Sequence, residues 1–102
     1  MRIISYGRIR EFYELHPESQ VSLDAWYDIT ADADWGNFAE TRATFRSADI
    51  YQRCIIFDVG HNKYRLVAWV SYQTHKVFIR RVMTHAEYDK DKWKSDCEKS
   101  KS

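Results

Sequence analysis

Apolar and polar residues alternate along positions 63–72 and again along 76–84, with the period of two that is typical of β-strands. The polar break at 73–76 favours a tight turn, so we expect an antiparallel hairpin. Pairing Gln73 with Lys76 would place Leu66 opposite Met83 and Arg65 opposite Thr84.

This register predicts one apolar and one mixed face. The apolar face, expected to be core, carries Tyr64, Leu66, Ala68, Val70, Val77, Ile79 and Met83. The mixed face carries Lys63, Arg65, Trp69, Phe78, Arg80 and Thr84, while Arg81 points to the opposite side. Cations interleaved with aromatic rings suit the backbone and bases of a nucleic acid.

The first third of the chain predicts a short strand at 2–5 and two helices. Helical spacing of apolar residues indicates a helix over 7–16, which Pro17 ends. A second helix is expected to bury the stripe Val21, Ala25, Trp26, Ile29 and Ala33. The two helices would form a hairpin that covers one face of the sheet.

Residues 34–50 predict a long connection with one possible helical turn at 38–44, followed by a strand at 53–59. The turn at 60–62 leads into the hairpin described above, and we prefer the loop that sets Asp58 opposite Arg65 because it keeps Asp58 off the core face. The expected fold class is therefore α+β, in the order β-α-α-β-β-β, with a small and mainly antiparallel sheet.

The sequence Thr84-His85-Ala86-Glu87 has the pattern of a capping box, which predicts a short C-terminal helix. Thr84 would be the N-cap and His85 the first helical residue, with Tyr88 near the same side. An imidazole in this position can exchange protons near neutral pH, so His85 is a candidate acid or base.

The length of 102 residues fits one domain, which we place at 1–93 with a polar, frayed tail at 94–102. The net charge of +1 hides an asymmetry: residues 11–49 hold nine Asp/Glu and two Lys/Arg, whereas 60–85 hold five Lys/Arg and no acid. The basic part suits a nucleic-acid partner.

Cys54 and Cys97 stand far apart in the sequence, without a CxxC or Cys/His grouping, so we expect free thiols and no metal site. No apolar run is long enough to span a bilayer, and the first residues lack a signal-peptide pattern. We therefore expect a cytoplasmic protein without a cofactor.

Five stretches resemble one known family: residues 25–27 (AWY), 33–35 (ADW), 47–49 (SAD), 62–67 (NKYRLV) and 84–90 (THAEYDK). In this order and spacing they are similar to HigB-type toxins of type II toxin–antitoxin systems, within the wider RelE/ParE-like group. The resemblance implies ribosome-dependent, metal-independent cleavage of mRNA. It also implies neutralisation by a HigA-type antitoxin with a helix-turn-helix.

The resemblance also implies residue roles. The arginine after the tyrosine of the YRLV motif is Arg65, and the imidazole and tyrosine after the last strand are His85 and Tyr88. RelE-like relatives carry lysines on the strand where this chain has Ile56 and Asp58, so Lys63 would substitute and the assignment of acid and base stays open. The expected catalytic residues are His85, Arg65, Tyr88 and Lys63, and the expected RNA-binding residues are Arg80, Trp69 and Lys90.

Two other functions share this fold. A ParE-like toxin poisons DNA gyrase without catalysis, and an acid–base residue after the last strand argues against it. A non-catalytic RNA-binding module would tolerate the loss of His85. Fold alone does not decide among the three.

Overall fold

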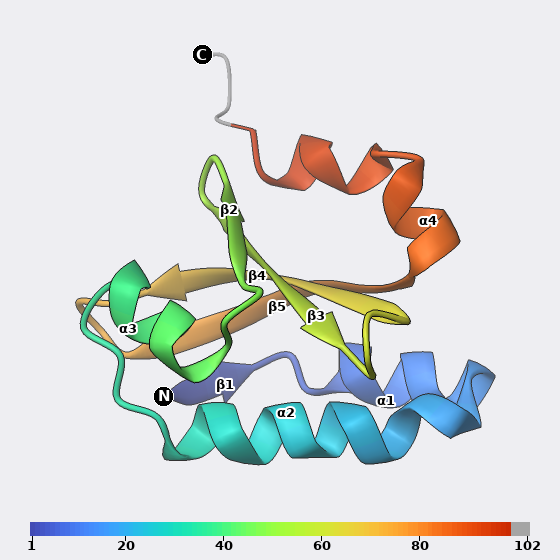
Figure 1. Cartoon of the computed structure of the whole chain (residues 1–102), viewed down its shortest axis with the longest axis horizontal. Coiled ribbons are helices and arrows are strands. Elements are labelled where there is room, and N and C mark those ends of the chain that lie inside the picture. Colours follow the sequence, from blue (N-terminus) through green and yellow to red (C-terminus); the bar gives the residue numbers. More distant parts are fainter. Residues whose placement is uncertain (99–102) are drawn as a thin grey trace.

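The computed structural model describes residues 1–98 and has α+β architecture (Figure 1). Its strands are β1 (Arg2–Ile4), β2 (Asp49–Tyr51), β3 (Cys54–Val59), β4 (Tyr64–Ser71) and β5 (Lys76–Thr84). Its helices are α1 (Gly7–Leu15), α2 (Gln20–Asp32), α3 (Phe38–Thr44) and α4 (His85–Asp89), with 3₁₀ turns η1 (Pro17–Ser19) and η2 (Lys92–Asp96). No helix in this part of the chain is long and apolar enough to cross a bilayer.

The five strands form one sheet in the order β1-β5-β4-β3-β2, in which only the β1–β5 pair is parallel. The α1–α2 hairpin lies on one side of the sheet, and α4 with the C-terminal segment lies on the other (Figure 1). The main core fills the layer beneath the helices, where Phe57, Leu66 and Ile79 meet Ile9 and Leu23. The predicted fold class and the helical hairpin are confirmed.

A second, smaller core lies on the other side of the sheet. It contains Cys54, Ile56, Val67, Met83, Trp93 and Cys97. Cys54 and Cys97 form a disulfide across a sequence separation of 43, so the prediction of two free thiols was wrong. Cys97 and Trp93 are buried, which corrects the expected frayed tail for 94–98; residues 99–102 lie outside the described part.

The β4–β5 register differs from the prediction for two reasons: the turn is two residues longer, which shifts the pairing by two positions and keeps the faces, and β5 contains a bulge, which changes them. Near the turn, Ser71 pairs with Lys76 and Ala68 with Ile79. Beyond the irregularity between Val67 and Ala68, Leu66 pairs with Val82 and Arg65 with Met83. An extra residue in one strand reverses which face the following side chains occupy, and alternation in the sequence does not reveal it.

The bulge has three consequences for the predicted faces. Val82 packs against the main core in the place expected for Met83, which lies instead in the second core. Arg81 pairs with Val67, so it shares the face of Arg65 and not the opposite one. Thr84 pairs with Tyr64, one position from the expected Arg65.

The second helix buries Trp26, as predicted, and Ala33 packs against the main core, but the rest of the buried stripe differs from the prediction. Its buried residues are Leu23, Trp26 and Thr30, whereas Val21 is 81% and Ile29 47% exposed. The 3₁₀ turn η1 separates Pro17 from this helix, and Thr30, a polar residue, is fully buried in it. The edge strand β2 was also missed, because three residues with Asp49 at their start resemble a loop.

Candidate functional site

The first turn of α4 is fixed by the predicted capping box, which the structure confirms. The Thr84 hydroxyl accepts a hydrogen bond from the Glu87 amide at 3.2 Å, and the Glu87 carboxylate accepts one from the Thr84 amide at 3.0 Å. These reciprocal bonds satisfy backbone donors that a helix start leaves free. They hold His85 at the first helical position, at the end of β5.

His85 is half-exposed and its Nδ1 lies 3.0 Å from the Asp89 carboxylate, one helical turn away. A carboxylate on one ring nitrogen orients the imidazole and leaves the other nitrogen for a substrate. The backbone amide of His85 donates to the carbonyl of Lys63 at 3.2 Å, so the exposed Lys63 is its neighbour from the β3–β4 turn. The structure thus brings together two of the predicted catalytic residues.

Arg65 is buried, with 7% of its surface exposed, and its donors are used within the protein. Its Nε binds Asp58 at 2.9 Å, as the preferred β3–β4 register predicted. Its Nη atoms donate to the Asn62 carbonyl, the Tyr64 carbonyl and the Asn62 side chain at 3.1, 3.2 and 2.5 Å. Four contacts among five N–H groups make Arg65 a brace for the turn, which leaves little capacity to clamp a phosphate.

Tyr88 connects this brace to the C-terminal segment. The Arg65 guanidinium lies 5.1 Å from the Tyr88 ring centroid, and the ring stacks on Trp93 at 5.0 Å with an interplanar angle of 9°. Burial raises the pKa of the Tyr88 phenol, and the nearby Asp49 and Asp58 carboxylates add to this against the opposing Arg65 charge. The phenol is therefore a neutral donor at physiological pH and not a base.

Trp69 and Arg80 form a separate cluster. The guanidinium groups of Arg80 and Arg53 lie 4.2 and 4.4 Å from the Trp69 ring centroid. Trp69 lies five residues along β4 from Tyr64, the partner of Thr84, which is roughly 16 Å at the rise of a strand. The predicted RNA-binding pair is thus close in space, apart from His85, and the Trp69 ring already contacts two cations.

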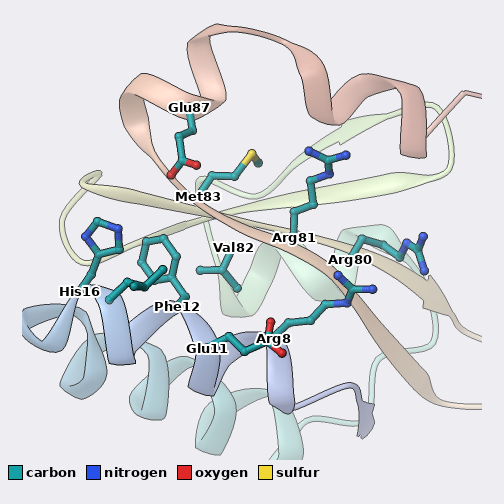
Figure 2. Close-up of a pocket in the computed structure, with 10 residues that line it drawn as sticks. Arg8, Glu11, Phe12, His16, Arg80, Arg81, Val82, Met83 and Glu87 are labelled. Carbon is teal, nitrogen blue, oxygen red and sulfur yellow. The ribbon is translucent and has the colours of Figure 1, made fainter.

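A groove of about 360 Å³ runs between α1 and β5 toward α4 (Figure 2). Its polar lining is Arg8, Glu11, His16, Arg80, Arg81 and Glu87. Sequence reasoning missed Arg8 and His16 at this groove, although Arg8, Glu11 and Leu15 have the spacing of one helix side. Arg81 is turned toward the C-terminal segment, where its Nε contacts the Asp96 carboxylate at 2.6 Å (Figure 2).

Lys90 is exposed and lines a smaller groove with Glu87, Lys92 and Trp93. This groove adjoins α4, so Lys90 is nearer to His85 than the Trp69 cluster is. Within residues 1–98, no group of three or more His, Cys, Asp or Glu side chains is arranged to hold a metal ion.

The site lies within a segment that matches known proteins. Residues 19–91 match the family model of HigB_toxin, described as the RelE-like toxic component of a toxin–antitoxin system. The "mRNA interferase HigB" of Escherichia coli O6:H1 is 28% identical over 93 residues, 88% of this chain and 90% of that protein. The "mRNA interferase toxin HigB" of E. coli K12 is 32% identical over 92 residues, 87% of this chain and 88% of that protein.

Proposed function

Because this chain belongs to the HigB toxin family, we propose that it is the toxin of a type II toxin–antitoxin system and an endoribonuclease that cleaves mRNA. The observation that carries the proposal is the half-exposed His85 at a capped helix start, with one ring nitrogen held by Asp89. The relatives of this chain that are named mRNA interferases support mRNA as the substrate.

Cleavage of an RNA strand without a metal requires two proton transfers. A base removes the proton of the 2′-hydroxyl, which attacks the adjacent phosphorus, and an acid protonates the departing 5′-oxygen. In our proposal His85 performs one of these transfers through Nε2, while Asp89 holds Nδ1. Lys63, next to His85 and exposed, neutralises charge that develops on the phosphate.

The other expected site residues take supporting roles in this proposal. Arg65 holds the turn that carries Lys63 and the ring of Tyr88, and the neutral Tyr88 phenol orients the substrate. Lys90 contacts RNA beside α4, and the Trp69–Arg80 cluster binds it farther along the sheet.

We also propose that cleavage depends on the ribosome and takes place in the cytoplasm. The N–H donors of Arg65 are occupied by contacts within the protein, so the chain supplies few free cations around His85. A ribosome that presents the mRNA in a reactive geometry would supply much of the positioning that this site lacks. A HigA-type antitoxin with a helix-turn-helix would neutralise the toxin.

The test is to map mRNA 5′ ends after brief induction of the wild-type chain and of His85→Gln. The proposal predicts new 5′ ends within translated regions for the wild type only. A purified reaction on programmed ribosomes, with magnesium kept for ribosome integrity, then tests metal use: a transition-metal chelator should leave the rate unchanged. Growth arrest with DNA damage and without new mRNA ends would point to a gyrase poison and overturn the proposal.

A further inference from the structure

One face of α2 is apolar and uncovered. Val21, Ala25 and Ile29 recur every four residues, and all three are exposed, Val21 by 81% and Ile29 by 47%. Helix α2, which carries them, lies on the side of the sheet opposite α4 (Figure 1). Leu23, Trp26 and Thr30 already supply the buried face of this helix, so packing within residues 1–98 does not explain the second stripe.

The stripe borders a groove of about 250 Å³. Ala25, Trp26 and Ile29 line one wall, and Phe45 with the turn residues Gly60 and His61 lines the other. Trp26 is 3% exposed, and its indole Nε1 is buried without a hydrogen-bond partner among the described residues. The exposed part of the Trp26 ring therefore adds apolar lining to the groove, which continues the apolar stripe.

The charge around the stripe selects the occupant. From position 11 to position 41 the chain has eight Asp/Glu and no Lys or Arg. Asp28 and Asp32 are exposed on α2 beside the stripe and make no salt bridge within the described residues. Such a surface repels RNA and attracts a cationic protein segment.

We propose that the face formed by Val21, Ala25 and Ile29 docks a basic amphipathic helix of the antitoxin; this inference rests on the proposed toxin–antitoxin function. The stripe runs from Val21 to Ile29, a rise of about 12 Å or two helical turns, which suits the apolar side of a helix laid along it. The small Ala25 at its centre permits close approach of the partner backbone. Lys or Arg on the flank of the partner helix pairs with Asp28 and Asp32.

The test uses the antitoxin encoded beside the toxin gene, titrated calorimetrically against toxin carrying His85→Gln so that both proteins can be produced. Ala25→Arg places bulk and positive charge at the centre of the stripe and should weaken binding about 100-fold. Ala31→Arg is the matched control, because Ala31 is an exposed alanine on another side of the same helix. It should change Kd by less than about twofold.

Two further variants separate the contributions. Ile29→Ala should weaken binding about tenfold, and the pair Asp28→Asn and Asp32→Asn should reduce the salt dependence of Kd. Equal affinity of Ala25→Arg and Ala31→Arg toxins, both folded by circular dichroism, would overturn the proposal. So would a toxin homodimer that Ala25→Arg dissociates while antitoxin affinity is unchanged, since the occupant would then be a second copy.

The binding assay contains neither ribosome nor RNA, so its outcome is independent of cleavage. A wild-type chain that binds antitoxin in this pattern but cleaves no mRNA would refute the nuclease and keep the surface. A chain that cleaves mRNA, but whose affinity for the antitoxin is unchanged by substitutions in the stripe, would refute the docking surface and keep the nuclease.

Discussion

At the scale of single residues, the site is organised by how each polar side chain is already occupied. His85 gives one nitrogen to Asp89 and keeps the other, whereas Arg65 gives almost all its donors to Asp58, Asn62 and Tyr64. A residue that acts on a substrate must have a hydrogen-bonding atom that is not already occupied within the protein. This distinction assigns chemistry to His85 and support to Arg65, although the sequence presents both as candidate catalytic residues.

We expect His85→Gln to lower the cleavage rate by about 10² to 10⁴, because it removes one of two proton-transfer groups. Asp89→Asn should lower it less, since the imidazole stays but is no longer held by a carboxylate. Single-turnover cleavage on saturating ribosome–mRNA complex measures both. A folded His85→Gln protein with near wild-type rate would remove His85 from the site.

Arg65→Ala should destabilise the protein by about 3 kcal/mol, since it leaves Asp58 and the Asn62 carbonyl without their partner near the protein interior. Urea denaturation measures this loss, and cleavage should fall with it. Asp58→Asn is the variant to compare, because it weakens the ion pair that holds Arg65 and leaves the arginine side chain in place. A large rate loss in Arg65→Ala with unchanged stability would instead make Arg65 a direct phosphate ligand.

At the scale of elements, regular patterns were predictable and irregular ones were not. The capping box of α4, the α1–α2 hairpin and the Asp58–Arg65 pairing follow from local residue chemistry, and the structure confirms them. The bulge in β5 and the face that α2 buries depend on how distant elements pack. A single bulge exchanged Met83 for Val82 and moved Arg81 to the face of Arg65.

The two arginines at the bulge should therefore behave differently from each other. Arg80→Ala should raise the apparent Kd for ribosome–mRNA complex and leave the saturated rate nearly intact, because Arg80 contacts Trp69 away from His85. Arg81→Ala should loosen η2, since it removes the contact with Asp96. Hydrogen exchange of the Trp93 indole reports on η2, and equal protection in wild type and Arg81→Ala would contradict this role.

The contact between η1 and β4 should make stability depend on pH. The Tyr64 hydroxyl donates to Glu18 at 3.1 Å, and the pKa of Glu18 lies below its ordinary value of 4.5, first through its own backbone hydrogen bond and then through Tyr64. The ionised form is thus favoured in the folded state. The contribution of ionised Glu18 to the free energy of unfolding is fully present above pH 4.5. It is lost as the pH falls through the lowered pKa of Glu18 in the folded state.

Glu18→Gln should accordingly lower the urea midpoint at pH 7, with the difference from wild type shrinking on acidification below pH 4.5. Glu14→Gln, an exposed carboxylate on α1, is the control. A difference that stays constant from pH 7 to pH 3 would show that the charge of Glu18 does not contribute.

At the scale of the whole molecule, the C-terminal segment completes the fold. Trp93 and Cys97 cover Val67 and Met83 on the sheet face that carries Arg65 and Trp69, and the disulfide joins this segment to β3. The predicted RNA surface is thus partly covered, and the exposed chemistry is concentrated at the start of α4. The alternation of residues in β4 and β5 gave no indication of this cover, because the segment 94–98 is short and polar.

A disulfide stabilises chiefly by restricting the unfolded chain, and closing a loop with a sequence separation of 43 gives about 4 kcal/mol in the chain-entropy account. We therefore expect Cys54→Ala, or reduction with dithiothreitol, to lower the free energy of unfolding by about 2–4 kcal/mol. Because the Trp93 ring also packs against Tyr51 and Tyr88, the segment should remain on the sheet after reduction, and cleavage should persist. Urea denaturation and ribosome-dependent cleavage, each with and without dithiothreitol, test the two statements separately. If reduction releases η2 and raises the cleavage rate several-fold, the covered face of the sheet takes part in RNA binding, and the assignment of the chemistry to α4 alone is wrong.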